Sequence, residues 1–219
     1  MDRILEVLAR PEYPDLLWRH VSLSAAALAI GTVVALVVAM LVSRSPLGAF
    51  IAINVGNVGR AVPSLAILAL VFPLPGFGFG FNTALVALTA LAIPPILINA
   101  STALRQVSPQ VIDAARGMGF SNSQILGRIK LPIAAPVIFA GIRTSAVQVV
   151  ASATLATFVG GGGLGDLIVE GYSRGDNYIM LAGAFSVAVL AIITELGFGG
   201  LERALTPKGL KVAQTRRGK

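Results

Sequence analysis

Side chains able to carry out bond-making chemistry are few in this chain. Its 219 residues include 17 Lys and Arg, 10 Asp and Glu, one histidine and no cysteine. The four glycines at 160–163 resemble part of a phosphate cradle, but the Gly-Lys-Ser/Thr that completes a P-loop is missing. No group of His, Cys, Asp or Glu residues has metal-ligand spacing. The single histidine, His20, lies outside the predicted spans, so the serines within the spans have no histidine with which to form a catalytic Ser-His pair. The energy source for any active work is therefore expected on another chain.

One polar segment, residues 105–131, lies between strongly apolar stretches. It combines alanine and glycine with a few charges, beginning its central run at Asp113. A helix with such small side chains can fit into a groove on a partner protein, and its basic residues can pair with acidic groups of that partner. Because Gly119 permits a sharp turn, the pattern predicts two short helices, 109–118 and 122–130, joined at this glycine.

Two charges, Arg60 and Glu195, fall inside otherwise apolar stretches. A charge inside a bilayer is costly and usually faces a bundle interior or a water-filled cavity. Two interpretations stay open for each residue. Arg60 either snorkels or lies on a path across the membrane, and Glu195 either lies on that path or pairs near the interface, with Arg203 as one partner. The candidate path residues are Asn54, Asn57, Arg60, Ser64 and Glu195.

The composition indicates an all-α, polytopic integral membrane protein. The chain is 55% hydrophobic and only 12% charged, against about 25% charged in soluble domains. About 20 apolar residues cross a bilayer. Pro94-Pro95 should bend or unwind the third span near its middle. Five transmembrane helices are expected, at about 21–43, 47–74, 83–104, 132–158 and 178–200, with the second broken by Arg60 and Pro63.

Charge distribution predicts the orientation of these spans. An N-terminal segment, 1–20, precedes the transmembrane domain, 21–200, and a basic tail, 201–219, follows it. Arg44, the polar segment and the tail all fall on one face of a five-span protein, and the opposite loops carry an excess of acids. The positive-inside rule places the basic face in the cytoplasm. A multi-pass protein of the cell membrane, with its N-terminus outside and its C-terminus inside, is therefore expected.

Four stretches resemble a known family. The polar segment matches E-A-A-x3-G-x9-I-x-L-P, the coupling loop of ABC-importer permeases, except that Asp113 replaces glutamate. The runs that start at Val62 (VPSLA), Thr157 (TFVGGGGLGDLI) and Leu201 (LERALTP) resemble stretches of the permeases for the osmoprotectants glycine betaine, carnitine and choline. The resemblance covers residues from about 20 to 210.

This resemblance implies an ABC type I importer permease, with short cytoplasmic coupling helices. It implies a second permease, either identical or paralogous, an extracytoplasmic substrate-binding protein and ABC ATPase subunits that carry MgATP. This chain itself needs no cofactor, metal or catalytic residue, and its other partner is membrane lipid rather than nucleic acid. The residues expected at the ATPase contact are Asp113, Ala114, Ala115, Arg116, Gly117, Gly119, Leu131 and Pro132. Residues 105–131 are called the coupling segment below.

Three other functions remain to be weighed. Permeases for methionine or another amino acid share the five-span layout and the glycine-rich run. A secondary transporter working alone would need inverted repeats and buried coupling acids, of which only Glu195 is available. An intramembrane enzyme lacks its catalytic groups. One Trp and three Tyr, all near predicted interfaces, make a high-affinity aromatic cage for a quaternary amine within the spans unexpected.

Overall fold

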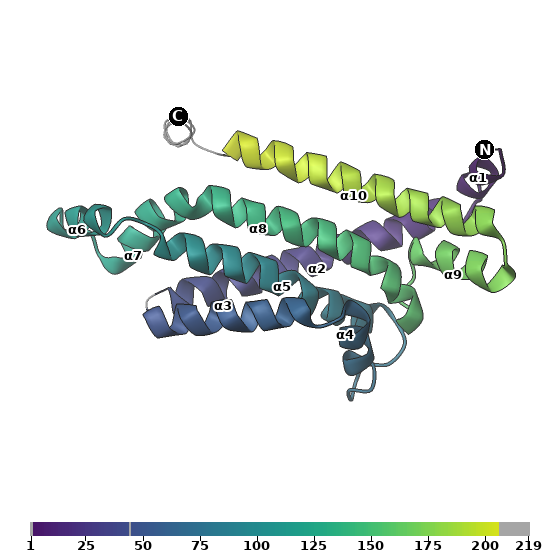
Figure 1. Ribbon diagram of the computed structural model, residues 1–219, viewed down its shortest axis with the longest axis horizontal. Helices are drawn as coiled ribbons and strands as arrows, with labels where there is room; N and C mark the ends of the chain where they lie inside the picture. The colour runs from purple at the N-terminus through teal and green to yellow at the C-terminus, as the bar shows by residue number, and fades with distance from the viewer. Residues whose placement is uncertain (1, 44, 206–219) are drawn as a thin grey trace.

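Apolar stretches in a bilayer must satisfy their backbone polar groups internally, and this chain does so with helices. The computed structural model describes residues 2–43 and 45–205 (Figure 1). The α-helices are α1 (Asp2–Leu8), α2 (Tyr13–Val42), α3 (Pro46–Ala61), α4 (Ser64–Val71), α5 (Phe81–Arg105), α6 (Pro109–Gly117), α7 (Asn122–Ile125), α8 (Leu131–Ser152), α9 (Gly165–Arg174) and α10 (Asn177–Leu205). A π-helix, η1 (Leu126–Lys130), precedes α8, and a 3-10 helix, η2 (Ala153–Val159), follows it.

Four helical stretches are long and apolar enough to cross a membrane, and α3 with α4 forms a fifth, bent pair. The angle between α3 and α4 is 95°. The cause is Pro63, because a residue before proline avoids the helical region. Val62 is accordingly extended, with ψ at 126°. The predicted five spans, with a break in the second, agree with this arrangement.

Three prolines lie within long helices without breaking them. Pro14 stands in the first turn of α2, where its missing N–H is no loss. The first span therefore starts well before residue 21. Pro94-Pro95 were expected to bend or unwind the third span, yet α5 is helical throughout. Both prolines are buried in the bundle, and the Asn99 side chain donates to the Pro95 carbonyl at 2.8 Å, so packing holds the helix together.

The centre of the bundle is α5, which packs against α2, α3 and α8. Small residues make this possible, because they let helix backbones approach closely. A Cβ built on Gly31 of α2 would lie 2.6 Å from the Cβ of Ala92. The Ser145 hydroxyl of α8 donates to the Ala92 carbonyl at 2.9 Å, and thereby joins α8 to α5 at the same level. In contrast, α10 lies outside this centre and packs on α8, α9 and α1.

The two ends of the bundle carry different elements (Figure 1). The connection between α2 and α3, the coupling segment and the C-terminal end of α10 share one end, whereas α1 and α9 share the other. The sequence-based prediction of three segments on one face agrees with this arrangement. Two contributors to that prediction, Arg44 and the tail beyond Leu205, lie outside the described residues.

The glycine-rich run packs helices together. A Cβ on Gly165 would lie 2.1 Å from the Thr154 carbonyl oxygen, so the helix start touches η2 directly. Gly163, with φ at 113°, lies against His20. His20 is fully buried within the protein, and its Nε2–H donates to the Val150 carbonyl at 2.9 Å. Close packing therefore explains these glycines without a phosphate.

We expect Gly171→Ala to destabilise the fold. Its Cβ would lie 2.3 Å from the backbone nitrogen of Met180, and such overpacking costs about 1–3 kcal/mol. The matched control is Gly197→Ala in α10, where no atom lies within 4 Å of the added Cβ and where alanine favours the helix by about 0.5–1 kcal/mol. Thermal denaturation of the detergent-solubilised protein measures both. Equal midpoints for the two variants would contradict the close contact.

Candidate coupling site

Helix α6 presents the motif alanines on opposite sides. Pro109 stands in its first turn, where proline is well tolerated. Ala115 is fully buried against the rest of the protein, and Ala114 is exposed. Asp113 and Arg116 are both mainly exposed and form an ion pair at 3.6 Å, an interaction worth at most about 1 kcal/mol on a surface. One alanine therefore anchors α6, and the other leaves flat surface for a partner.

Gly119 ends α6 with a Schellman motif. Its φ is +83°, the left-handed conformation that closes this kind of helix end. The Phe120 N–H donates to the Ala115 carbonyl at 3.1 Å, and the Gly119 N–H donates to the Arg116 carbonyl at 2.9 Å. The predicted turn between two short helices is confirmed here. The glycine at this position of the motif thus has a local cause: glycine is the residue that adopts this conformation without strain.

The second short helix starts from a capping box. The Ser121 hydroxyl accepts from the Gln124 N–H, and the Gln124 side chain accepts from the Ser121 N–H at 2.8 Å. Two amide groups that a helix start leaves unpaired are satisfied in this way. This helix was expected to end near residue 130, before a new span at Pro132. Instead it continues without a break into α8 and η2, from Asn122 to Val159.

The π-helix η1 explains how this continuous helix tolerates a proline. Proline lacks an N–H, and its ring collides with the carbonyl four residues earlier in an α-helix. Immediately before Pro132, the Leu131 N–H donates to the Leu126 carbonyl, one residue further back than in an α-helix. The wider turn precedes the proline and the helix goes on. Widened turns of this kind are frequent at functional sites.

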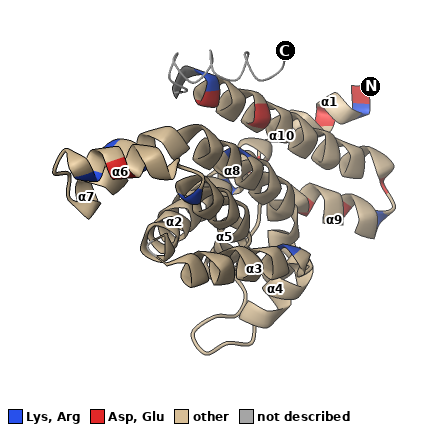
Figure 2. Ribbon diagram, turned by 60° about the vertical axis from the view of Figure 1, so that its left-hand side comes forward, with Lys and Arg blue, Asp and Glu red and all other residues tan. Residues whose placement is uncertain are grey.

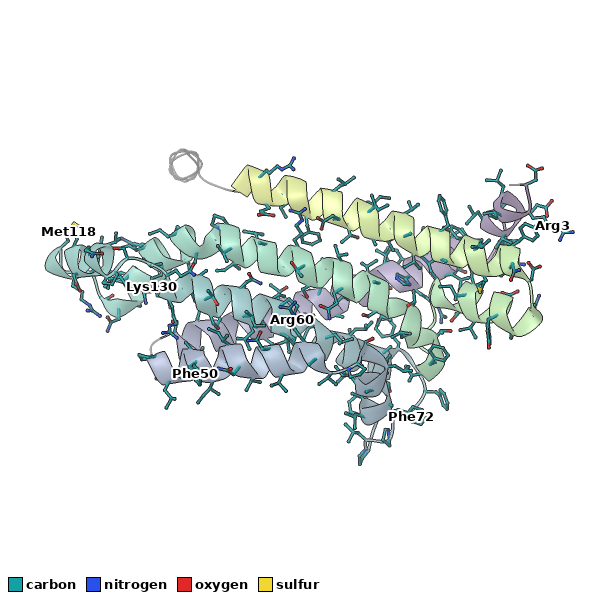
Figure 3. The ribbon with its side chains drawn as sticks, viewed as in Figure 1. Arg3, Phe50, Arg60, Phe72, Met118 and Lys130 are labelled. Atoms are coloured by element: carbon teal, nitrogen blue, oxygen red, sulfur yellow. The ribbon has the colours of Figure 1, made fainter. Side chains whose placement is uncertain are left out.

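The two short helices, η1 and Ser43 after α2 line a hollow of about 490 Å³. Its mouth carries Arg116 from α6 and Lys130 from η1, so the hollow is basic. Figure 2 shows basic residues and an acidic residue on α6 and beside α7 at this end, and acidic together with basic residues on α1 and α9 at the other. Figure 3 places Met118 at the tip of this end, far from Arg3. The lining residues are Ser43, Ile112, Arg116, Asn122, Ser123, Ile125, Leu126 and Lys130.

The path candidates separate into two groups. Asn54, Asn57 and Arg60 are exposed along α3, and Ser64 opens α4 directly beyond the bend. Figure 3 shows Arg60 between the two ends of the bundle. Glu195 lies apart from these four residues, on α10 at the opposite side of the bundle. The structure therefore does not assemble all five candidates into one site.

Glu195 pairs with Arg143 of α8, a partner that the sequence interpretation did not name. The Nε of Arg143 donates to Glu195 at 2.9 Å, and its Nη1 donates to Glu202 at 3.1 Å. The prediction named Arg203 as the partner of Glu195. The sequence did contain a signal for this pairing. Arg143 is a charge in the middle of an apolar stretch, and Glu195 and Glu202 are two acids seven residues apart on one helix. What the sequence lacked was the register between α8 and α10.

The described part of the chain is an all-helical membrane protein that exposes a polar segment, with two short helices, at one end of its bundle. Residues 20–207 match the model for the binding-protein-dependent transport system inner membrane component. The chain belongs to this family. It is a permease of the ABC-importer type, as the resemblance implied.

Several characterised proteins are similar along most of their length. The carnitine transport permease protein OpuCB of Listeria monocytogenes is 42% identical over 90% of this chain and 89% of its own length. The osmoprotectant import permease protein OsmW of Salmonella typhimurium is 33% identical over 96% of this chain and all of its own. The MetNI methionine ABC transporter, in an inward-facing conformation, contains a chain with a TM-score of 0.77 at 23% identity, over 90% of this chain and all of its own. At that identity the likeness shows the fold alone.

We expect Gly119→Ala to loosen the end of α6. A side chain in the left-handed region costs about 1–2 kcal/mol, which raises the open population about 5–30-fold. The control is Gly117→Ala, because both positions have open space around an added Cβ and only Gly119 has a positive φ. Hydrogen exchange of the backbone at 109–120 measures the opening. Identical exchange in both variants would remove the conformational explanation for Gly119.

Proposed function

We propose that this chain is the permease subunit of an ATP-driven importer of quaternary-amine osmoprotectants such as glycine betaine, choline or carnitine. The observation that carries the proposal is the 42% identity to a carnitine transport permease across about nine tenths of both chains. Relatives named for choline and for glycine betaine transport, 38% identical, add support. The alternative, methionine, rests on a structural likeness at 23% identity, which speaks only for the fold.

ATP hydrolysis in this proposal takes place on a separate ABC ATPase, which holds MgATP and docks on the coupling segment. The exposed Ala114 and the basic hollow fit a partner with a groove and acidic groups. Asp113 and Gly119 then have distinct roles. Asp113 presents a carboxylate on the exposed face, one methylene shorter than the glutamate of the motif, whereas Gly119 shapes the turn that presents it.

The coupling end faces the cytoplasm in this proposal. Between Arg105 and Lys130, four bases stand against the single acid Asp113. Segments near the opposite end, α1 and α9, carry mainly acids (Figure 2). Excess Lys and Arg on cytoplasmic loops is the rule for membrane proteins. The N-terminus then lies outside, where a substrate-binding protein delivers the substrate.

A second permease, identical or paralogous, completes the translocation path along α3. The outer face of α3 exposes large apolar side chains, among them Phe50 and Val58, and also Asn54, Asn57 and Arg60. Amides and a guanidinium facing hydrocarbon are expensive, so these polar groups favour a protein or water-filled neighbour. Glu195 is not part of this path, because its carboxylate is engaged by Arg143.

Uptake of labelled compounds tests the proposed function. Glycine betaine, choline, carnitine and methionine are offered to cells with the gene, without it, and with the gene restored. We expect uptake of at least one quaternary amine to fall without the gene and to return when it is restored. Loss of methionine uptake alone would contradict the substrate class, and unchanged uptake of all four would contradict the whole proposal.

We expect Arg60→Ala to lower uptake by about tenfold, which corresponds to about 1.4 kcal/mol, while the protein still inserts and reaches normal abundance. The physical reason is loss of the charge that α3 holds between the two ends of the bundle. Arg174→Ala is the control, because Arg174 is a 66% exposed arginine at the far end. Normal uptake by an Arg60→Ala protein of wild-type abundance would exclude Arg60 from the path.

A further inference from the structure

Helix α10 carries a seat for an arginine. Glu195, Gly199 and Glu202 follow one another on one face of the helix, at spacings of four and three residues. The guanidinium of Arg143 donates to both carboxylates and lies over the glycine between them. A Cβ on Gly199 would lie 3.3 Å from Cζ of Arg143, so the missing side chain makes the seat flat. We name these three residues the arginine seat.

Arg143 belongs to the helix that begins in the coupling segment. The stretch from Asn122 to Val159 is continuous, and Arg143 stands 13 residues after Lys130. At 1.5 Å per residue, this puts it about 20 Å along the helix from η1. A shift of the docking end along the helix axis is therefore carried to Arg143.

Helix α10 has few other ties to the centre of the bundle. It packs on α8, α9 and α1, and an apolar groove separates it from α2. The groove is lined by Ile142 beside Arg143 and by Thr194 beside Glu195. At its far end, α10 is fixed by the contact between Gly171 and Met180 and by a hydrogen bond of 3.0 Å from Tyr13 to Ser186. In the half nearer the coupling segment, the arginine seat joins α10 to α8.

We propose that Arg143 is a positioning residue that makes α10 follow the coupling helix, by pinning the coupling half of α10 to α8 through the arginine seat. This inference rests on the proposed docking of an ATPase on the coupling segment. An ion pair of this kind is directional, and breaking it leaves charges unpaired within a span. Without the seat, movement of α8 no longer sets the position of α10, and ATP hydrolysis is spent without transport.

The test compares Gly199→Leu with Gly200→Leu in proteoliposomes that contain the complete transporter with its ATPase and binding protein. The ratio of substrate taken up to ATP hydrolysed is measured. An added side chain at Gly199 meets Arg143, whereas no atom lies within 4 Å of a Cβ at Gly200. We expect about a tenfold fall in the ratio for Gly199→Leu, the upper part of the usual range for coupling variants, and a near wild-type ratio for Gly200→Leu.

Charge exchange gives a second test that does not depend on the glycine. Arg143→Glu should lower the ratio of substrate taken up to ATP hydrolysed. The double variant Arg143→Glu with Glu195→Arg should restore this ratio, because the ion pair between α8 and α10 forms again with its charges exchanged. A merely structural role predicts changed abundance instead, which is measured in parallel. A wild-type ratio in Arg143→Glu, or a double variant no better than the single one, overturns the proposal.

Gly119→Asp separates this inference from the function on which it rests. If Gly119→Asp lowers the ratio and Gly199→Leu does not, the arginine seat has no role in coupling and the docking proposal stands. If Gly119→Asp leaves the ratio unchanged, docking on the coupling segment is itself wrong. Equal wild-type ratios for Gly199→Leu and Gly200→Leu overturn the seat in either case.

Discussion

The structure depends on one helix that stays continuous through a proline. Proline removes a backbone donor and normally ends or kinks a helix. Here the π-turn of η1 widens the helix just before Pro132, and Asn122 to Val159 remain a single element. This element begins with the capping box after the turn at Gly119 and ends at the glycine-rich run near α9. It therefore links the end that carries the coupling segment to the opposite end without a loop, which would absorb a displacement.

Charge in an apolar environment is the second constraint. Of the charges in apolar stretches, Arg143 and Glu195 satisfy each other across α8 and α10, whereas Arg60 stays exposed on α3. The ion pair between Arg143 and Glu195 acts within one subunit, where it joins two helices. The exposed guanidinium of Arg60 needs water or a further protein chain beside it, because a charge that faces hydrocarbon is costly. The same physics thus supports two different proposals: that Arg143 holds α10 in place, and that Arg60 faces a path shared by two permeases.

The sequence predicted what local chemistry determines. The number of spans, the break at Pro63, the turn at Gly119 and the first short helix follow from proline, glycine and capping residues, whereas the second short helix continues into α8. Prediction from the sequence failed where contacts between helices determine the structure. Pro94-Pro95 stay helical inside the packed centre. The partner of Glu195 could not be named because spacing within α8 and within α10 does not fix how the two helices face each other.

The absence of cysteine from the chain makes the central claim directly measurable. Single cysteines are introduced at Ala114, exposed on α6, and at Ser173, exposed on α9 at the opposite end. Their reaction rates with a maleimide reagent are compared before and after the ATPase subunit is added to the purified permease. Docking on the coupling segment predicts strong protection at position 114 and none at position 173. Unchanged labelling at 114 on a complex that has demonstrably formed would contradict the account.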